Sequence, residues 1–316
     1  MKRTGLILLM LMVFSSVSCN AEDDGVERSA MTQEKKIVRK AAGSGRWFPG
    51  NREQLLKDIR TYMDEADVPQ IKGKIVSAIA PHAGYQFSGK VAGYTFKAIE
   101  ENIKKGNSPE TIVILGLSHR AGFAGVALMD GDAIETPLGE TELDKEAGKI
   151  LVDSSKRISF NYTPHAMEHS AENEIPFTQV AAPKAKLVIG LIGDHSRETM
   201  DDLLKAIIEL SGKKEILVVA STDLLHDPDY ELVGKTDKET LEIIGKMDAD
   251  KLEKKWSPGN QICCGICPVL TAIRFAEGKG CEKGDVLFYR NSGDDDPSGR
   301  GVWVVGYGAV VFAVDE

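Results

Sequence analysis

Cysteines and basic runs are scarce in this chain of 316 residues, and each scarcity argues against a class of protein. Three of its five cysteines are crowded into residues 263–267, which is poor spacing for disulfides that join distant loops. The net charge of −9, with no basic run among aromatics, argues against nucleic-acid binding. The core must therefore hold without disulfides, and the crowded thiols point to chemistry instead.

Apolar runs long enough to span a membrane are also missing. The N-terminus contains a shorter apolar run. Residues 1–19 contain two cations, an apolar run from Leu6 to Phe14, small residues and then Cys19. This layout predicts a secretory signal, and the Ser-Val-Ser-Cys sequence resembles the lipidation site of bacterial lipoproteins. Residues 20–40 are polar without an apolar period, which predicts a flexible tether. We therefore expect an exported protein, which is either a lipoprotein anchored to the membrane through Cys19 or a periplasmic or extracellular protein without that anchor.

Short runs rich in Val and Ile alternate with stretches of helical period along residues 41–316. The runs predict strands buried on both faces at Ile75–Ala80, Thr111–Leu117, Leu187–Gly193 and Ile216–Thr222. The amphipathic stretches predict helices at Gln54–Ala66, Lys90–Lys104, Thr199–Leu210, Asp237–Lys246, Asp248–Lys254 and Pro268–Glu277. Two more strands are expected at Val286–Tyr289 and Val302–Ala313. The alternation predicts a single α/β domain with a mainly parallel central sheet flanked by helices.

Three of the six histidines come shortly after predicted strands: His82, His119 and His226. Asp223 lies three residues before His226. Because α/β sheets bind ligands at the carboxyl ends of their strands, we expect these histidines to share one site. His195 also follows a predicted strand, and it is either a bystander or a fourth contributor.

Two histidines plus one anionic ligand form a recurring catalytic metal site, because neutral imidazole binds transition metals well. The anion could be Asp223, a glutamate of the segment EHSAENE, or a thiolate of the segment NQICCGICP. For most carboxylates of residues 168–174, the pattern favours a solvated, acidic helix start. Cys264 and Cys267 also form a C-x-x-C pair, which suggests a redox dithiol or half of a zinc site.

The chain also resembles a known family over about residues 43–313. The resemblance rests on the segments GRWFPGNREQLLKDI, PHAGYQFSG, ILGLSHR, TPLGETELD, EHSAENEIPF, ASTDLLHD, ICCGICP and VVGYGAVVF. It is similar to the Memo-like family, called AmmeMemoRadiSam system protein B in bacteria and archaea. This resemblance implies a fold like that of class III extradiol dioxygenases, which hold non-haem iron with two histidines and a glutamate. In Memo-like proteins a cysteine replaces that glutamate, and iron or copper is associated with the family.

Carried over by motif, the resemblance implies that His82, His119 and Cys264 hold the metal. His226 matches the histidine that acts as base in the dioxygenases, and Asp223 stands beside it. We therefore expect a redox protein with iron or copper, zinc also being possible, that acts on an unidentified small molecule or oxygen species. The family's usual gene neighbours imply a link to an AMMECR-domain protein and a radical SAM enzyme. A non-catalytic metal- or ligand-binding protein and a C-x-x-C thiol oxidoreductase are the alternatives.

Overall fold

The computed structural model describes residues 35–120 and 122–315. The signal and lipidation site expected at residues 1–19 lie outside this range, as does most of the expected tether. The end of the tether differs from expectation, because Val38–Lys40 forms strand β1, parallel to β5 (Ala133–Thr136). The folded unit begins at Lys36, and backbone pairing with β5 is the reason that it starts before residue 41.

A sheet of nine strands forms the centre of the described chain, in the order β10-β12-β2-β9-β3-β8-β4-β7 with β11 on β12. The four central strands are parallel: β2 (Lys74–Ala80), β9 (Ile216–Ser221), β3 (Thr111–Leu117) and β8 (Lys186–Ile192). Antiparallel pairing is confined to the flanks, which contain β10 (His226–Asp227), β11 (Gly284–Asn291), β12 (Val304–Val314) and β4 (Val126–Leu128). Strand β7 (Ile158–Phe160) is parallel to β4 at the edge. The predicted α/β fold with a mainly parallel centre is confirmed.

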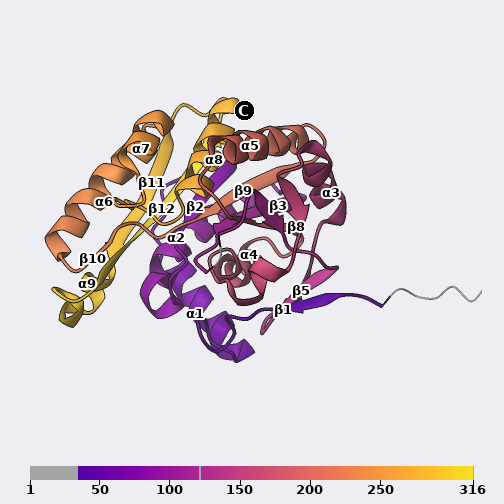
Figure 1. The fold of residues 1–316 in the computed structure, drawn as a ribbon. Coiled ribbons are helices and arrows are strands. Elements are labelled where there is room, and N and C mark those ends of the chain that lie inside the picture. The colour runs from indigo at the N-terminus through magenta and orange to yellow at the C-terminus, as the bar shows by residue number, and fades with distance from the viewer. Residues whose placement is uncertain (1–34, 121, 316) are drawn as a thin grey trace, which may run out of the picture. The chain divides into compact units, whose positions relative to one another are not determined.

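Helices cover both faces of this sheet (Figure 1). One face packs against α1 (Arg52–Asp64), α2 (Tyr85–Lys104) and α4 (Ile175–Ala181). The other packs against α3 (Lys145–Ser154), α5 (Arg197–Ser211), α6 (Tyr230–Gly245), α7 (Ala249–Lys255) and α8 (Ile266–Gly278). A smaller sheet joins β1 and β5 to β6 (Gly139–Glu142). Short helical turns occupy Thr163–Met167, Glu172–Glu174, Ser292–Asp295 (α9) and Pro297–Gly299.

Strand β3 shows why the sequence buries both faces of the sheet. Val113 and Leu115 belong to the hydrophobic cluster that contains α5 and α8, whereas Ile112 and Ile114 belong to the cluster that contains α1 and α2. All four side chains are completely buried. Burying one such side chain contributes about 1.5–3 kcal/mol, so this central strand stabilises both layers of helices.

All six predicted helices and all six predicted strands are present among the described residues. The largest differences are at two helix starts, since α2 begins at Tyr85 instead of residue 90 and α6 at Tyr230 instead of residue 237. Both differences bring a helix N-terminus closer to a predicted site residue, His82 or His226. Among the described helices, none combines the length and apolar character needed to cross a membrane.

Candidate metal centre

The carboxyl ends of β2, β9 and β3 bring the predicted residues together. These strands are neighbours in the sheet, and Ala80 at the end of β2 pairs with Ser221 at the end of β9. His82 follows β2 by two residues and His119 follows β3 by two. Their rings lie edge to face, with centroids 5.2 Å apart. The structure therefore places these two histidines in one site, as the strand-end pattern predicts.

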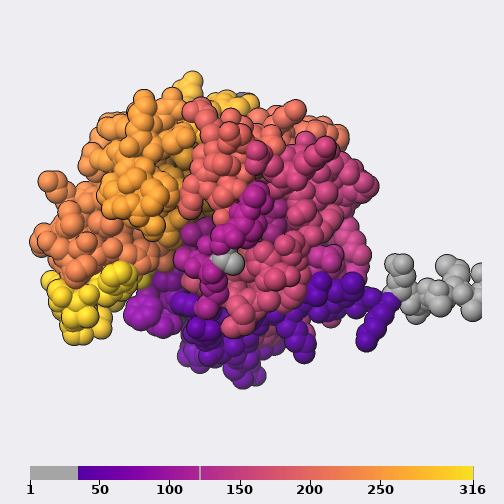
Figure 2. All heavy atoms as spheres, in the orientation of Figure 1, coloured from indigo at the N-terminus to yellow at the C-terminus, as the bar shows by residue number. Residues whose placement is uncertain are grey.

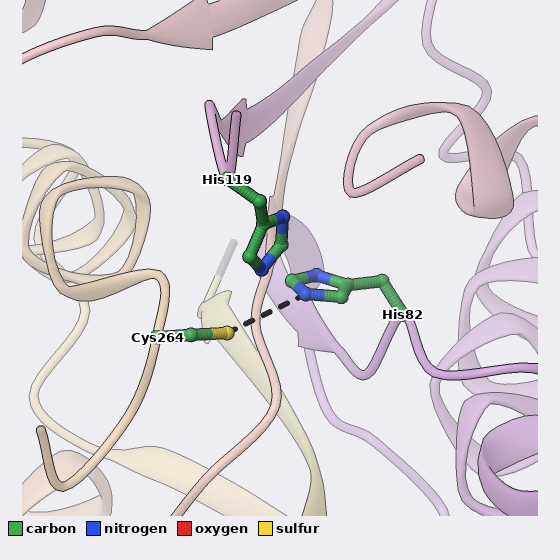
Figure 3. A group of neighbouring side chains, drawn as sticks. All are labelled: His82, His119 and Cys264. Atoms are coloured by element: carbon green, nitrogen blue, oxygen red, sulfur yellow. Dashed lines mark hydrogen bonds between the residues drawn. The ribbon is translucent and has the colours of Figure 1, made fainter. Parts of the chain in front are cut away.

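Cys264 reaches the same point from the loop that precedes α8. Its backbone N–H donates to the carbonyl of Asp223 at 3.1 Å, and the N–H of Gly265 donates to the Thr222 hydroxyl at 2.8 Å. The Cys264 Sγ lies 3.4 Å from Nε2 of His82. Figure 3 shows both imidazoles and the sulfur directed toward a common point from three separate segments.

The spacing of these donors fits a single metal ion. One donor atom each from His82, His119 and Cys264 lies within 4.8 Å of the other two. Metal–ligand bonds of about 2.0–2.3 Å at tetrahedral angles separate ligand atoms by roughly 3.3–3.8 Å. The pair formed by His82 and Cys264 already has this separation, and the other two pairs lie within 4.8 Å.

Hydrogen bonds fix the tautomer of His82, which is 1% exposed. Its Nδ1 lies 2.9 Å from the Ser221 hydroxyl, which also contacts the carbonyl of Ser170 at 2.5 Å. Because that carbonyl can only accept, the hydroxyl donates to it and accepts from Nδ1–H of His82. Burial lowers the pKa of His82 to about 3, so the ring is neutral. Its Nε2 therefore keeps a free lone pair on the side of Cys264.

Glu174 completes this buried network from the other side of Ser221. Its Oε1 lies 2.7 Å from the Ser221 hydroxyl, and its side chain is fully buried. Burial raises the pKa of Glu174 well above its ordinary value, which favours the protonated carboxyl. The acid proton can then be donated to Ser221, whose hydroxyl proton is already directed at the Ser170 carbonyl. Glu174 thus supports the orientation of His82 without touching it.

Glu168 orients His119. Its Oε1 lies 2.9 Å from Nδ1 of His119, and its Oε2 accepts the backbone N–H of the same histidine at 2.6 Å. The backbone N–H groups of His169 and Ser170 also donate to Oε1. Burial opposes the charge of Glu168, but hydrogen bonds from His119, the nearby His169 and Ser170 hold its pKa well below the usual range. The carboxylate therefore accepts Nδ1–H and leaves Nε2 of His119 available to a metal.

The expectation that residues 168–174 form a solvated acidic helix start is wrong. Glu168, Glu172 and Glu174 are 3%, 4% and 0% exposed. Glu172 has a separate structural role, since its carboxylate accepts the backbone N–H groups of Ala42 and Gly43. The three acids can be buried because each has a hydrogen-bond partner inside the protein. The sequence of polar residues does not reveal these partners.

The Cys264 thiol is protonated in the absence of a cation. Burial, with the neighbouring Asp223 carboxylate, raises the pKa of this thiol to about 12. The backbone N–H of Asp223 donates to the sulfur at 3.3 Å and prepares it to carry negative charge. A metal ion binding here must displace the thiol proton, since the thiolate is the ligand.

Asp223 and His226 have different partners from those expected. Asp223 Oδ1 accepts the backbone N–H groups of His82 and Ala83, so this carboxylate positions the His82 segment and does not orient His226. His226 instead has its Nδ1 3.0 Å from the carbonyl of Leu224.

His226 does line a cleft of about 500 Å³ that is also lined by His119 and Cys264. Figure 2 shows the segment that follows β3, in magenta, exposed on the surface, and the His119 side chain is 32% exposed.

His195 does not join the group of donors found among the described residues. Its ring stacks on Trp256 with centroids 4.6 Å apart, and the indole N–H donates to the carbonyl of Cys263 at 3.0 Å. His195 thereby supports the loop that carries Cys264. Cys267 is 3% exposed, and its Sγ lies 3.8 Å from the carbonyl of Asp194.

Replacing Gly265 with alanine is expected to disturb this loop. The new Cβ would lie 2.6 Å from the Ser221 carbonyl oxygen and 2.8 Å from Thr222 Cβ, neither of which can move freely. We expect a loss of about 1–3 kcal/mol in the free energy of unfolding, together with weaker metal binding, in denaturation and metal titrations. Gly259→Ala is the matched control, because nothing lies within 4 Å of its added Cβ. Equal stability and equal metal affinity in the two variants would contradict the close approach of Gly265 to Ser221 and Thr222.

The family model for Memo-like protein matches residues 39–311. The chain belongs to the Memo-like protein family. This Memo-like protein is 34% identical to a MEMO1 family protein of Methanopyrus kandleri, over 87% of this chain and 99% of the relative. It is 32% identical to a MEMO1 family protein of Nitrosopumilus maritimus, over 87% of this chain and all of the relative. The crystal structure of an uncharacterized Escherichia coli K12 protein aligns at 11% identity and a TM-score of 0.45, over 74% of this chain and 99% of the other.

Proposed function

We propose that this Memo-like protein binds one transition-metal ion through His82, His119 and Cys264 and is redox-active with iron or copper. The observation that carries the proposal is the meeting of three donor atoms, from three distant segments, within 4.8 Å of one another. The hydrogen bonds of Ser221 and Glu168 leave an Nε2 lone pair on each ring. Such outer partners accompany ligating histidines in metal sites generally.

The donor chemistry favours a soft or borderline metal. Imidazole suits iron, copper and zinc, and thiolate favours copper(I) and zinc over hard cations such as Mg²⁺. A bound iron or copper ion would supply one-electron redox chemistry at positions that open toward the cleft. Replacing a carboxylate with a thiolate gives a softer, more reducing donor set than that of the dioxygenases, which disfavours aromatic ring cleavage.

The protein's own residues would supply proton transfer and orientation. Nδ1–H of His226 donates to the carbonyl of Leu224, which leaves Nε2 of His226 as a proton acceptor in the cleft. His226 can therefore accept a proton from a ligand bound beside His119 and Cys264. Asp223 contributes by holding the backbone of His82 in place.

The thiol oxidoreductase alternative is disfavoured by the state of the thiols. Burial raises the pKa of both Cys264 and Cys267 to about 12, whereas an attacking thiol in a redox pair needs a lowered pKa. Cys267 is also buried. The metal hypothesis uses the protonated Cys264 thiol directly, because the cation itself stabilises the thiolate.

Metal analysis of the purified chain, followed by oxygen-consumption assays with reductants, tests the proposal. We expect one metal per chain and consumption of oxygen that depends on iron or copper. Full occupancy without turnover under any condition would favour the non-catalytic binding protein. Absence of bound metal after loading with iron, copper and zinc would contradict the site itself.

Metal affinity is expected to rise with pH. Between about pH 7.5 and 9, His82 with a pKa of about 3 is neutral, while the Cys264 thiol with a pKa of about 12 still carries its proton. Binding then releases one proton, so affinity increases about tenfold for each pH unit. Titration with zinc in several buffers measures this slope. A flat profile in this window would show that no thiol proton is displaced.

A further inference from the structure

Apart from His119, Cys264 and His226, the residues that line the cleft beside the metal centre have no role in the proposed function. The cleft encloses about 500 Å³ and is lined by His119 and Cys264, together with residues of β10, α6 and the segment after α7. Binding sites for small molecules usually have volumes of about 300–1,000 Å³. The space therefore suits a small molecule that reaches the metal ligands from the surface.

The charges of the lining favour an uncharged occupant. No lysine or arginine is among the described residues that line the cleft, so an anion meets no cationic side chain there. Asp227, the one carboxylate among the described lining residues, already accepts the backbone N–H of Asp229. An ion pair with such a partly exposed carboxylate contributes little in water, so a cation gains little as well.

Two large apolar side chains line this cleft and stay open to solvent. Trp303 is 56% exposed and Leu232 is 45% exposed. The ring of Trp303 has its centroid 6.0 Å from that of His226, so an aromatic face lies next to the proton acceptor. Exposed apolar groups gathered at a cleft mark a binding surface, and an indole face prefers a flat partner.

A hydrogen-bond acceptor in the same cleft favours a ligand that carries a hydrogen-bond donor. His226 donates through Nδ1 to Leu224, which leaves its Nε2 as an acceptor. Thr236 also lines the cleft, and its hydroxyl can accept a hydrogen bond as well as donate one. We propose that the cleft binds an uncharged small molecule that carries a planar apolar group and an N–H or O–H donor. This inference rests on the proposed function only in placing the other end of the ligand beside the metal.

Benzamide, benzoate and benzamidine test the proposal, because they share one shape and differ in charge. Their affinities are measured by NMR titration of the full chain, as purified and after removal of metal with a chelator. In the metal-free chain, benzamide should bind at least about tenfold more tightly than either ion, since neither charge gains a buried partner. Tighter or equal binding of benzoate or benzamidine, or no binding of any probe, would overturn it.

Trp303→Ala should weaken benzamide binding by roughly 3- to 10-fold, as expected for loss of an aromatic contact. Phe87→Ala is the control, because Phe87 is 42% exposed and does not line the cleft. Zinc affinity should be the same in both variants as in the natural chain, which shows that each is folded. If Trp303→Ala binds benzamide as tightly as the natural chain does, the inference is overturned. If the natural chain does not bind zinc, only the proposed function is overturned.

Discussion

Replacing Cys264 with serine is expected to lower metal affinity by more than about 100-fold, because even partners that touch only the ligands typically contribute 10–100-fold. Serine keeps the shape of the side chain, but its hydroxyl is a far weaker donor to iron, copper or zinc than a thiolate. The sulfur also lies 3.4 Å from Nε2 of His82, so the substitution removes one of the three donors that meet in the group formed by His82, His119 and Cys264. Competition titrations with a chromophoric chelator measure the change.

Cys267→Ser is the matched control for this substitution. Cys267 is three residues away and buried, and its Sγ lies 3.8 Å from a backbone carbonyl, which a serine hydroxyl can also use. We expect the metal affinity of Cys267→Ser to stay within about threefold of the natural value, because Cys267 is not one of the proposed metal ligands. If Cys267→Ser loses activity and Cys264→Ser keeps its metal, the C-x-x-C oxidoreductase is the better account.

Glu168→Gln should weaken metal binding by about 10–100-fold, the usual effect of removing the partner of a ligating histidine. The glutamate accepts both Nδ1–H and the backbone N–H of His119. A glutamine of the same size offers one oxygen and one N–H₂ group, so one donor of His119 would face another donor. Unfolding should also become easier by about 1–3 kcal/mol, because a buried donor is left unpaired.

Glu172→Gln separates the effect on the metal from the effect on stability. Glu172 is as buried as Glu168, but it accepts backbone N–H groups of Ala42 and Gly43 instead of contacting a proposed ligand. This variant should lose stability in thermal denaturation while its zinc affinity stays unchanged. If both glutamine variants bind zinc equally well, Glu168 does not orient a ligand.

The positions of His82 and His119 could be predicted because strand ends are visible in the sequence. Runs such as TIVILGL are apolar on both faces, and a parallel sheet brings their carboxyl ends to one edge. The third ligand could not be chosen in this way, because Cys264 lies in a loop that hydrogen bonds to Asp223 and Thr222 only in the folded chain. Its assignment came from the family resemblance.

The supporting residues were missed for a different reason. Glu168 and Glu174 belong to a segment whose polar residues predict exposure to solvent. Their burial depends on partners far away in the sequence, His119 and Ser221. A tertiary partner is what turns an acid from a surface residue into an orienting one. Only the excess of carboxylates close to the histidines of EHSAENE hinted at this role.

The start of α2 was missed because glycine weakens a helical pattern. A Cβ at Gly89 would lie 2.5 Å from the Tyr62 ring, and a Cβ at Gly93 would lie 2.5 Å from the Tyr62 carbonyl oxygen. These glycines allow α1 to pack closely against α2, a tertiary requirement that overrides the local preference. The helix therefore begins at Tyr85, soon after His82.

X-ray absorption spectroscopy of the zinc-loaded chain tests the metal centre most directly. Coordination by His82, His119 and Cys264 predicts one sulfur at about 2.3 Å and two imidazole nitrogens at about 2.0–2.1 Å, with the sulfur absent from Cys264→Ser. A spectrum that contains only nitrogen and oxygen neighbours, or one that Cys264→Ser leaves unchanged, would contradict this account.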